Sequence, residues 1–281
     1  KREVNMSGSE ILILIISLVL CGFFLVQWFF PLFSVWPQSR VKFARRAFFL
    51  MPLSALIVFI ITVTQLASFD VVIDPAYQIF YIILGFAWIY LSLIMVSFFL
   101  GLSWKDDIFQ LNNKAALPAL FGAYLAAGLV YAGANIGDGP GWWCVVVAGG
   151  IGMIIFHIIN ILFHKLTGII DKITVDRDLS AGIRAGCFFL SCGVILGRAS
   201  GGDWVSFSQT VIDFWVAWPI LPLLVIAVIA EQNFQKNKTT TVGSSILIGV
   251  IYLLIAIAVL FILPPFPENP LYSLIQEGFI K

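Results

Sequence analysis

Long apolar runs separated by short polar stretches occupy most of the chain. A helix needs about 20 mainly apolar residues to cross the hydrocarbon core of a bilayer. Eight segments reach this length, at residues 10–32, 46–68, 77–103, 114–134, 142–164, 179–198, 204–230 and 242–263. Because lipid offers no partners to backbone polar groups, runs of this length are expected to be helices. The pattern therefore predicts an all-α polytopic membrane protein with about eight transmembrane helices.

Composition agrees with this class and narrows the function. Of the 281 residues, 60% are hydrophobic and 11% are charged, whereas an ordinary soluble domain has about 25% charged residues. A net charge of +1 argues against a nucleic-acid partner, which needs a basic patch. The four cysteines lack metal-ligand spacing, and no catalytic motif stands in a usable context. We therefore expect no enzyme, no cofactor, no metal and no disulfide framework.

The distribution of Lys and Arg among the loops predicts the orientation, because cytoplasmic loops carry an excess of these residues. The odd-numbered loops are basic and the second and fourth are acidic, so both termini should lie outside. The sixth loop contains one basic residue, Arg198, and one acidic residue, Asp203. The basic residues of the odd loops are Arg40, Lys42, Arg45, Arg46, Lys105, Lys114, Lys165, Lys172, Arg177, Lys236 and Lys238.

One stretch of the chain recurs. Residues 113–138 (NKAALPALFGAYLAAGLVYAGANIGD) align without a gap with residues 178–203 (DLSAGIRAGCFFLSCGVILGRASGGD), and tryptophan follows both. The alignment predicts a tandem parallel repeat of two-helix units over 108–235, at about 108–170 and 173–235. Asn113 and Asp178 are expected to cap the first helix of each unit. An N-terminal three-helix membrane region (10–103) and a final helix with an outward Pro-rich tail (242–281) complete the predicted organisation.

Small residues recur at every fourth position in both copies. The second copy has the pairs Gly182 and Gly186, and Gly193 and Gly197, while the first repeats alanine from Ala119. This spacing lets the backbones of two helices approach closely. Either plain close packing or helices that line a pore axis would explain the pattern.

The paired units resemble the YjfL-type family of bacterial inner-membrane proteins, a domain of unknown function with tandem two-helix units. The stretches "NNKAALPALFGAYLAAG" and "DLSAGIRAGCFFLSCG" carry this resemblance, which covers about residues 108–235. Leu111-Asn112 replaces the Glu-Gly of the family pattern, and Asp178 replaces an Asn. The resemblance implies a bacterial inner (plasma) membrane and no particular reaction. Some relatives look linked to envelope-stress gene clusters.

Ionisable groups inside a membrane are costly and mark candidate functional positions. The predicted intramembrane polar cluster comprises Asp213, Arg184, His157, Asn160, Gln209 and Thr210. Asp213 is expected near mid-membrane and paired with Arg184 across the helices. This cluster is either an ion pair that holds helices in register or a proton relay or ion site; alternatively, one or more of its residues snorkel to an interface. Asp138 and Asp203, in the matched outer loops, form either a pore mouth or turns that cap the next helix.

Two functions fit these observations. A transporter or channel for a small solute or ion predicts a water-accessible cavity that reaches Asp213. A non-catalytic membrane anchor or scaffold of an envelope-stress-related complex predicts a dry, ion-paired interior. The presence of charged residues inside the membrane favours the transporter or channel. Under both, the lipid bilayer is the surrounding medium, and a homo-oligomer or membrane-complex subunit is expected.

Overall fold

The computed structural model describes residues 6–33, 44–237 and 241–263. Within these ranges, eight helical segments are long and apolar enough to cross a membrane. They are α1 (Gly8–Phe33), α2 (Arg45–Gln65), α4 (Pro75–Leu100), α5 (Ala116–Ala134), α6 (Trp142–Thr167), α8 (Leu179–Ser200), the segment Phe207–Lys236, and α11 (Val242–Ile262). All regular elements of these ranges are helical. The predicted fold class is confirmed.

The seventh span differs from its prediction because it is not one continuous α-helix. It consists of α9 (Phe207–Asp213), the 3₁₀ turn η3 (Phe214–Ala217) and α10 (Ile220–Asn237). Pro219 stands at the junction, where it has no N–H to continue the hydrogen bonds of a regular helix. Helix α10 also continues past residue 230, where the apolar run ends, and this extension brings Glu231 into the bundle. Three further short helices occur in the loops: α3 (Phe69–Ile73), the π-helix η2 (Trp104–Gln110) and α7 (Ile169–Thr174).

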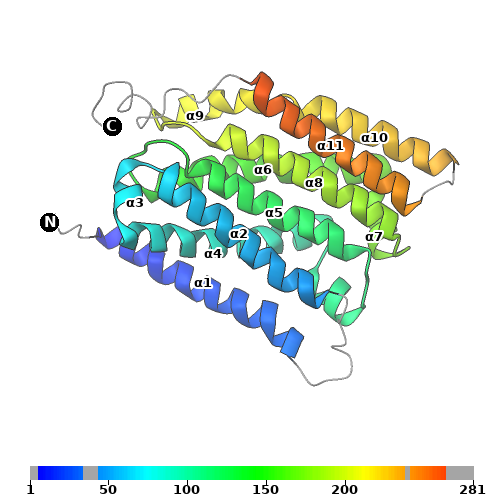
Figure 1. Ribbon diagram of the computed structural model, residues 1–281, viewed down its shortest axis with the longest axis horizontal. Helices are drawn as coiled ribbons and strands as arrows, with labels where there is room; N and C mark the ends of the chain where they lie inside the picture. Colours follow the sequence, from blue (N-terminus) through cyan, green and yellow to red (C-terminus); the bar gives the residue numbers. More distant parts are fainter. Residues whose placement is uncertain (1–5, 34–43, 238–240, 264–281) are drawn as a thin grey trace.

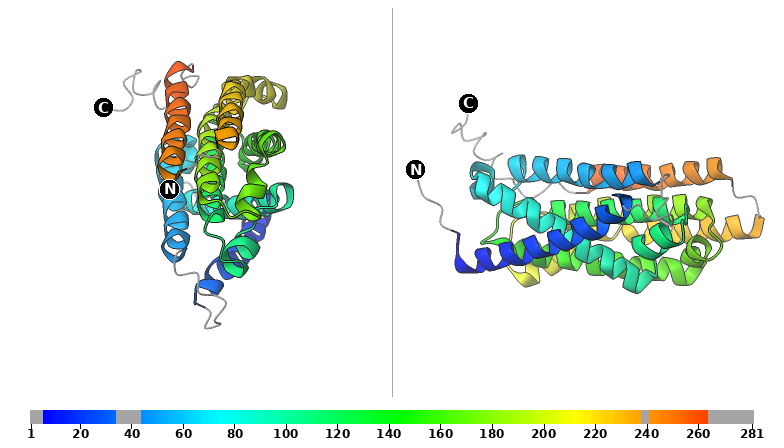
Figure 2. Two further views of the ribbon diagram at one scale, coloured as in Figure 1. Left: turned by 90° about the vertical axis from the view of Figure 1, so that its right-hand side faces the viewer. Right: turned by 90° about the horizontal axis from the view of Figure 1, so that it is seen from below.

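Helices α5 and α8 lie side by side at the centre of the bundle, and the other spans pack around them (Figure 1). Helix α2 covers α5 and α11 covers α8, so that α2 and α11 share one layer (Figure 2). Helices α4 and α6 pack against α5 from another side, and α1 lies at the edge against α4. One hydrophobic core runs through both halves of the described chain.

The contact between α5 and α8 depends on small residues. A Cβ atom added at Gly122 would overlap the backbone carbonyl of Gly186, and one added at Gly133 would overlap that of Gly197. In the other direction, a Cβ at Gly182 would overlap the carbonyl of Ala115. The close approach predicted from the glycine spacing is therefore present along the length of both helices.

Of the two predicted caps, Asp178 caps α8, whereas the prediction for Asn113 is wrong, since α5 begins after Ala115 and no side chain caps it. Asp178 Oδ1 accepts a 2.8 Å hydrogen bond from the backbone N–H of Ser180 at the start of α8. Asn113 Oδ1 accepts a 3.0 Å bond from Ala115 N–H, just ahead of α5. Such bonds satisfy backbone donors that have no partner inside the helix.

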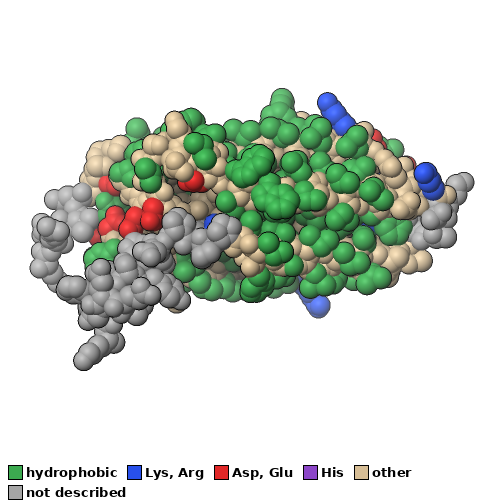
Figure 3. Space-filling view, turned by 90° about the horizontal axis from the view of Figure 1, so that it is seen from above, with side chains coloured by type: hydrophobic (Ala, Val, Ile, Leu, Met, Phe, Trp, Pro, Cys, Tyr) green, Lys and Arg blue, Asp and Glu red, His purple; other side chains and the backbone are tan. Residues whose placement is uncertain are grey.

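Acidic and basic side chains separate toward opposite ends of the bundle. On the face shown in Figure 3, most carboxylates gather toward one end and most Lys and Arg side chains toward the other. We call these the acidic end and the basic end; α1 begins at the acidic end and α11 runs back toward it (Figure 1). Which end faces the cytoplasm stays a prediction. Arg40, Lys42, Lys238 and the predicted Pro-rich tail (264–281) lie outside the described residues.

Candidate functional site

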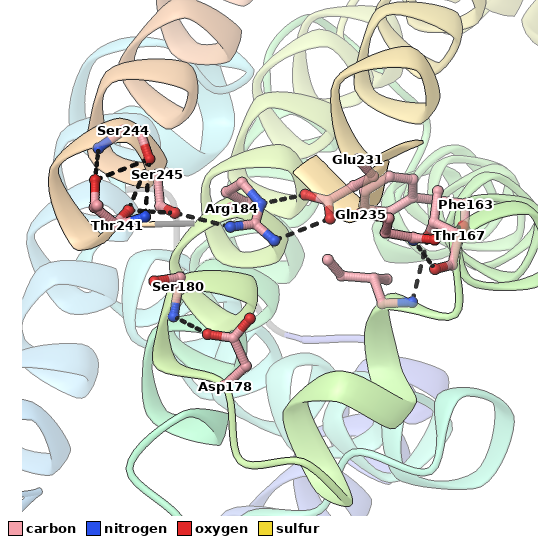
Figure 4. A network of polar contacts seen from close by, with 11 residues as sticks. Phe163, Thr167, Asp178, Ser180, Arg184, Glu231, Gln235, Thr241, Ser244 and Ser245 are labelled. Carbon is pink, nitrogen blue, oxygen red and sulfur yellow. Dashed lines mark hydrogen bonds and ion pairs between the residues drawn. The ribbon is translucent and has the colours of Figure 1, made fainter. Parts of the chain in front are cut away.

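A buried ion pair and a hydrogen bond from the same arginine join α8, α10 and α11 near the basic end of the bundle (Figure 4). Arg184 of α8 donates from Nε to Glu231 Oε1 and from Nη2 to Glu231 Oε2, the second at 3.0 Å. Its Nη1 donates to Ser245 Oγ of α11 at 2.8 Å. All three residues have 0% exposure. We refer to Arg184, Glu231 and Ser245 as the Arg184 network.

Neighbouring residues make further contacts with the Arg184 network. The Arg184 guanidinium carbon lies 4.6 Å from the ring centroid of Phe234, an arrangement in which the ring faces stabilise the cation. Ser245 Oγ also donates to the carbonyl of Thr241, at 3.0 Å. Nearby, burial lowers the pKa of the Lys172 ammonium, on which the charges of Glu231 and Arg184 act in opposite directions. Each of the three guanidinium nitrogens of Arg184 therefore has a partner from the protein itself.

The predicted pairing of Arg184 with Asp213 is wrong. Arg184 pairs with Glu231, and Asp213 instead accepts a 2.7 Å hydrogen bond from Gln209 Nε2 on its own helix, α9. The side chain of Asp213 is exposed rather than buried. Since α9 is a short helix ahead of the break in the seventh span, it keeps Asp213 toward the acidic end, away from the Arg184 network.

Sequence reasoning missed Glu231 and Ser245. Glu231 stands in the polar run "EQNFQKN", which reads as the beginning of a loop. Its helical register contains a usable signal, since Leu223, Ala227 and Glu231 follow at intervals of four and all have 0% exposure. A carboxylate that continues a buried stripe on a helix is a candidate partner for a buried cation.

A cavity of about 330 Å³ opens at the acidic end. Asp138, Asp203 and Asp213 line it together with Thr210 and Arg198; Arg198 was not among the predicted site residues. Other lining residues include Tyr81, Asn135, Cys144, Val145, Ala148 and Ser200. We call this space the acidic cavity. It brings Asp213 and Thr210 of the predicted cluster together with both acids of the predicted pore mouth.

The two matched turns meet at this cavity. The backbone N–H of Asp138 donates to Asp203 Oδ1 at 2.7 Å, across a separation of 65 residues. Trp204 N–H donates to the carbonyl of Asp138, also at 2.7 Å. Burial raises the pKa of the Asp138 carboxyl, and the negative charges of Asp203 and Asp70 raise it further. The cavity mouth therefore favours a proton or another positive charge beside Asp138.

The remaining predicted site residues lie on α6. His157 has 4% exposure and Asn160 has 1%. Asn160 Nδ2 donates to the carbonyl of Phe156 on the same helix, at 2.7 Å. Neither side chain hydrogen-bonds to the Arg184 network in the described part of the chain. The predicted cluster is thus divided among three places: the Arg184 network, the acidic cavity, and His157 with Asn160.

In the residues that the structure describes, no group of three or more His, Cys, Asp or Glu side chains is arranged to hold a metal ion. The four cysteines are free thiols.

Comparison with known proteins assigns a family to part of the chain. Residues 72–200 match the family described as Domain of Unknown Function (DUF350). This match bears out the resemblance to a YjfL-type uncharacterised family. It begins earlier than the predicted 108–235 and includes α4, and it stops before α9. No curated protein and no solved structure matches the chain.

The region similar to the DUF350 family thus comprises the third to sixth spans with η2 and α7. Asp138, His157 and Asn160 lie within this region, and Asp203 and Trp204 stand just beyond its end. Glu231 and Ser245 lie outside it, so the Arg184 network ties this region to the helices that follow.

Proposed function

We propose that the protein is a membrane transport protein, a channel or carrier, that admits a small cation or cationic solute through the acidic cavity. The observation that carries this proposal is the cavity of about 330 Å³ lined by Asp138, Asp203 and Asp213. Three carboxylates against the single guanidinium of Arg198 leave a negative balance, and charge of one sign in a cleft concentrates the opposite ion. On this view the protein is not an enzyme.

A tandem duplication would give such a pathway two similar halves. Local geometry that recurs at one spacing supports it: Asn112 and Arg177 both have positive φ, at 51° and 55°. The next residues, Asn113 and Asp178, both accept bonds from the N–H two positions on. The backbone N–H of Asn113 donates to the carbonyl of Asp107, and that of Asp178 donates to the carbonyl of Lys172, both at 2.8 Å.

A second function rests on the Arg184 network. A buried polar network whose members are all paired makes the packing of three helices specific and requires no solute. It favours a non-catalytic anchor or scaffold, in which α8, α10 and α11 form a rigid unit for a complex. Either function is compatible with a homo-oligomer or a complex subunit in a bacterial inner membrane with both termini outside.

Cation flux into proteoliposomes tests the proposal. Purified protein would be reconstituted into vesicles with trapped indicators for H⁺, Na⁺ and K⁺, and flux would be compared with empty vesicles. Asp138→Asn combined with Asp203→Asn should lower flux several-fold. Glu10→Gln is the matched control, because Glu10 belongs to the same end of the bundle, where it accepts a bond from Tyr77, and does not line the cavity.

Accessibility of position 213 separates the two functions further. With the four native cysteines replaced, Asp213→Cys should react with a membrane-impermeant thiol reagent added on one side. Cations that occupy the cavity should slow that reaction. Labelling that no cation affects, with flux equal to that of empty vesicles, would remove the transport function and leave the scaffold.

A further inference from the structure

Two buried polar side chains on α6 have hydrogen-bonding atoms without partners. Neither Nδ1 nor Nε2 of His157 has a partner among the described residues, and Asn160 Oδ1 has none either. The two residues lie three positions apart and therefore share a face of the helix. Their low exposure, 4% and 1%, removes them from the lipid-facing surface.

The protein around them is apolar. The ring of Phe99, from α4, lies 5.5 Å from the His157 ring, and that of Phe156 lies 5.6 Å from it. Phe156 in turn packs on Phe189 of α8 at 6.0 Å. These aromatic rings do not supply the strong donor and acceptors that an imidazole and an amide need. Unpaired polar groups are costly in an apolar interior.

The unpaired atoms form a set that water can satisfy. A neutral imidazole offers one N–H donor and one acceptor nitrogen, and the Asn160 oxygen is a second acceptor. Buried water typically makes two to four hydrogen bonds to such groups. We infer that His157 and Asn160 form a buried water-binding site beside the contact between α4 and α6.

The position of this site on α6 separates it from the acidic cavity of the proposed transport function. Ala148, on the same helix, lines the acidic cavity, whereas His157 lies nine residues later, about 14 Å along α6 but on the opposite side of the helix, where it packs against Phe99 of α4. Further along, near the basic end, His164 also has a buried nitrogen, Nδ1, without a partner. The water site therefore lies between the two ends of the bundle on the α4 side of α6, apart from the acidic cavity. A histidine there can accept a proton at one nitrogen and donate one from the other.

Deuterium exchange at the imidazole Cε1–H tests the site directly, because this exchange requires contact with solvent water. The full-length protein in lipid nanodiscs would be held in D₂O for days, digested, and analysed by mass spectrometry. The chain has only two histidines, so His164 serves as the internal reference. His157 should exchange at a rate comparable to that of His164. A His157 that does not exchange overturns the inference, whatever His164 does.

Substitution of Asn160 provides a second, independent readout. Asn160→Leu removes one partner of the bound water, so the exchange of His157 should slow several-fold. Met153→Leu is the control, since Met153 is a buried residue of α6 with 3% exposure and no role in the site. If Asn160→Leu raises the melting temperature and leaves the exchange of His157 unchanged, the Asn160 amide binds no water and the inference fails.

The two proposals fail separately. Exchange at His157 together with no cation flux would keep the water site and remove the transport function. Flux together with a fully protected His157 would keep transport and remove the water site.

Discussion

Removing one partner of the Arg184 network should be among the most destabilising single changes available in this protein. Glu231→Leu leaves the Arg184 guanidinium at 0% exposure without its counter-charge. Two N–H donors lose their carboxylate acceptor, and only the bond to Ser245 Oγ remains. Breaking a buried pair in this way costs about 3–5 kcal/mol. For a chain of this size, that loss lowers the melting temperature by roughly 6–20 °C.

Replacement of both partners should cost far less than replacement of one. Arg184→Met with Glu231→Leu removes both charges and keeps apolar volume, and such exchanges are often neutral or stabilising. The double variant should therefore melt well above either single variant. This non-additivity measures the coupling within the pair.

Thermal unfolding followed with a thiol-reactive fluorophore is a suitable assay, because Cys192 is a buried free thiol that becomes reactive on unfolding. Asp176→Asn is the control: Asp176 is exposed and belongs to the loop just ahead of α8, so it should change the melting temperature little. The reasoning is refuted if Glu231→Leu behaves like this control, or if the double variant is as unstable as the single variants combined.

Three further predictions follow from the packing and the caps. Gly186→Ala would push a Cβ into the backbone carbonyl of Pro118, at a cost of about 1–3 kcal/mol. Gly150→Ala is the control, because a Cβ there meets no atom within 4 Å and should not destabilise the protein. Melting curves of the two variants check both expectations. Asp178→Ala removes the cap of α8 and should cost about 0.5–2 kcal/mol, measured in the same way. The raised pKa of Asp138 means that the folded protein binds this proton more tightly than the unfolded chain. The stability contributed by this proton is present below the unfolded value of about pH 4 and is lost as the pH rises through the folded pKa. As the pH rises through that window, the melting temperature of the wild type should fall relative to that of Asp138→Asn. A parallel pH dependence of the two melting temperatures would contradict this prediction.

Several features of this protein could be predicted from the sequence because they depend on local properties of the chain. Eight apolar runs predicted the eight spans, since the length needed to cross a bilayer is a property of each segment alone. Asp178 was recognised as a cap because its bond reaches only to Ser180. The glycine spacing of α8 predicted a close helix contact for the same reason.

The partners of the charged groups could not be predicted in this way. Arg184 had several carboxylates available in the sequence, and the choice of Glu231 required α10 to extend beyond its apolar run and to lie beside α8. Asp213 was assigned to mid-membrane because nothing local showed the break at η3. The acidic cavity likewise joins residues from α3, α4, α6, α8 and α9 with the turns between them. The sequence of a segment determines whether it is long and apolar enough to cross a bilayer and whether lipid can surround it. Only the packed bundle decides which buried charges meet, because a desolvated charge is stabilised by groups within a few ångströms of it, and these come from segments far apart in the chain.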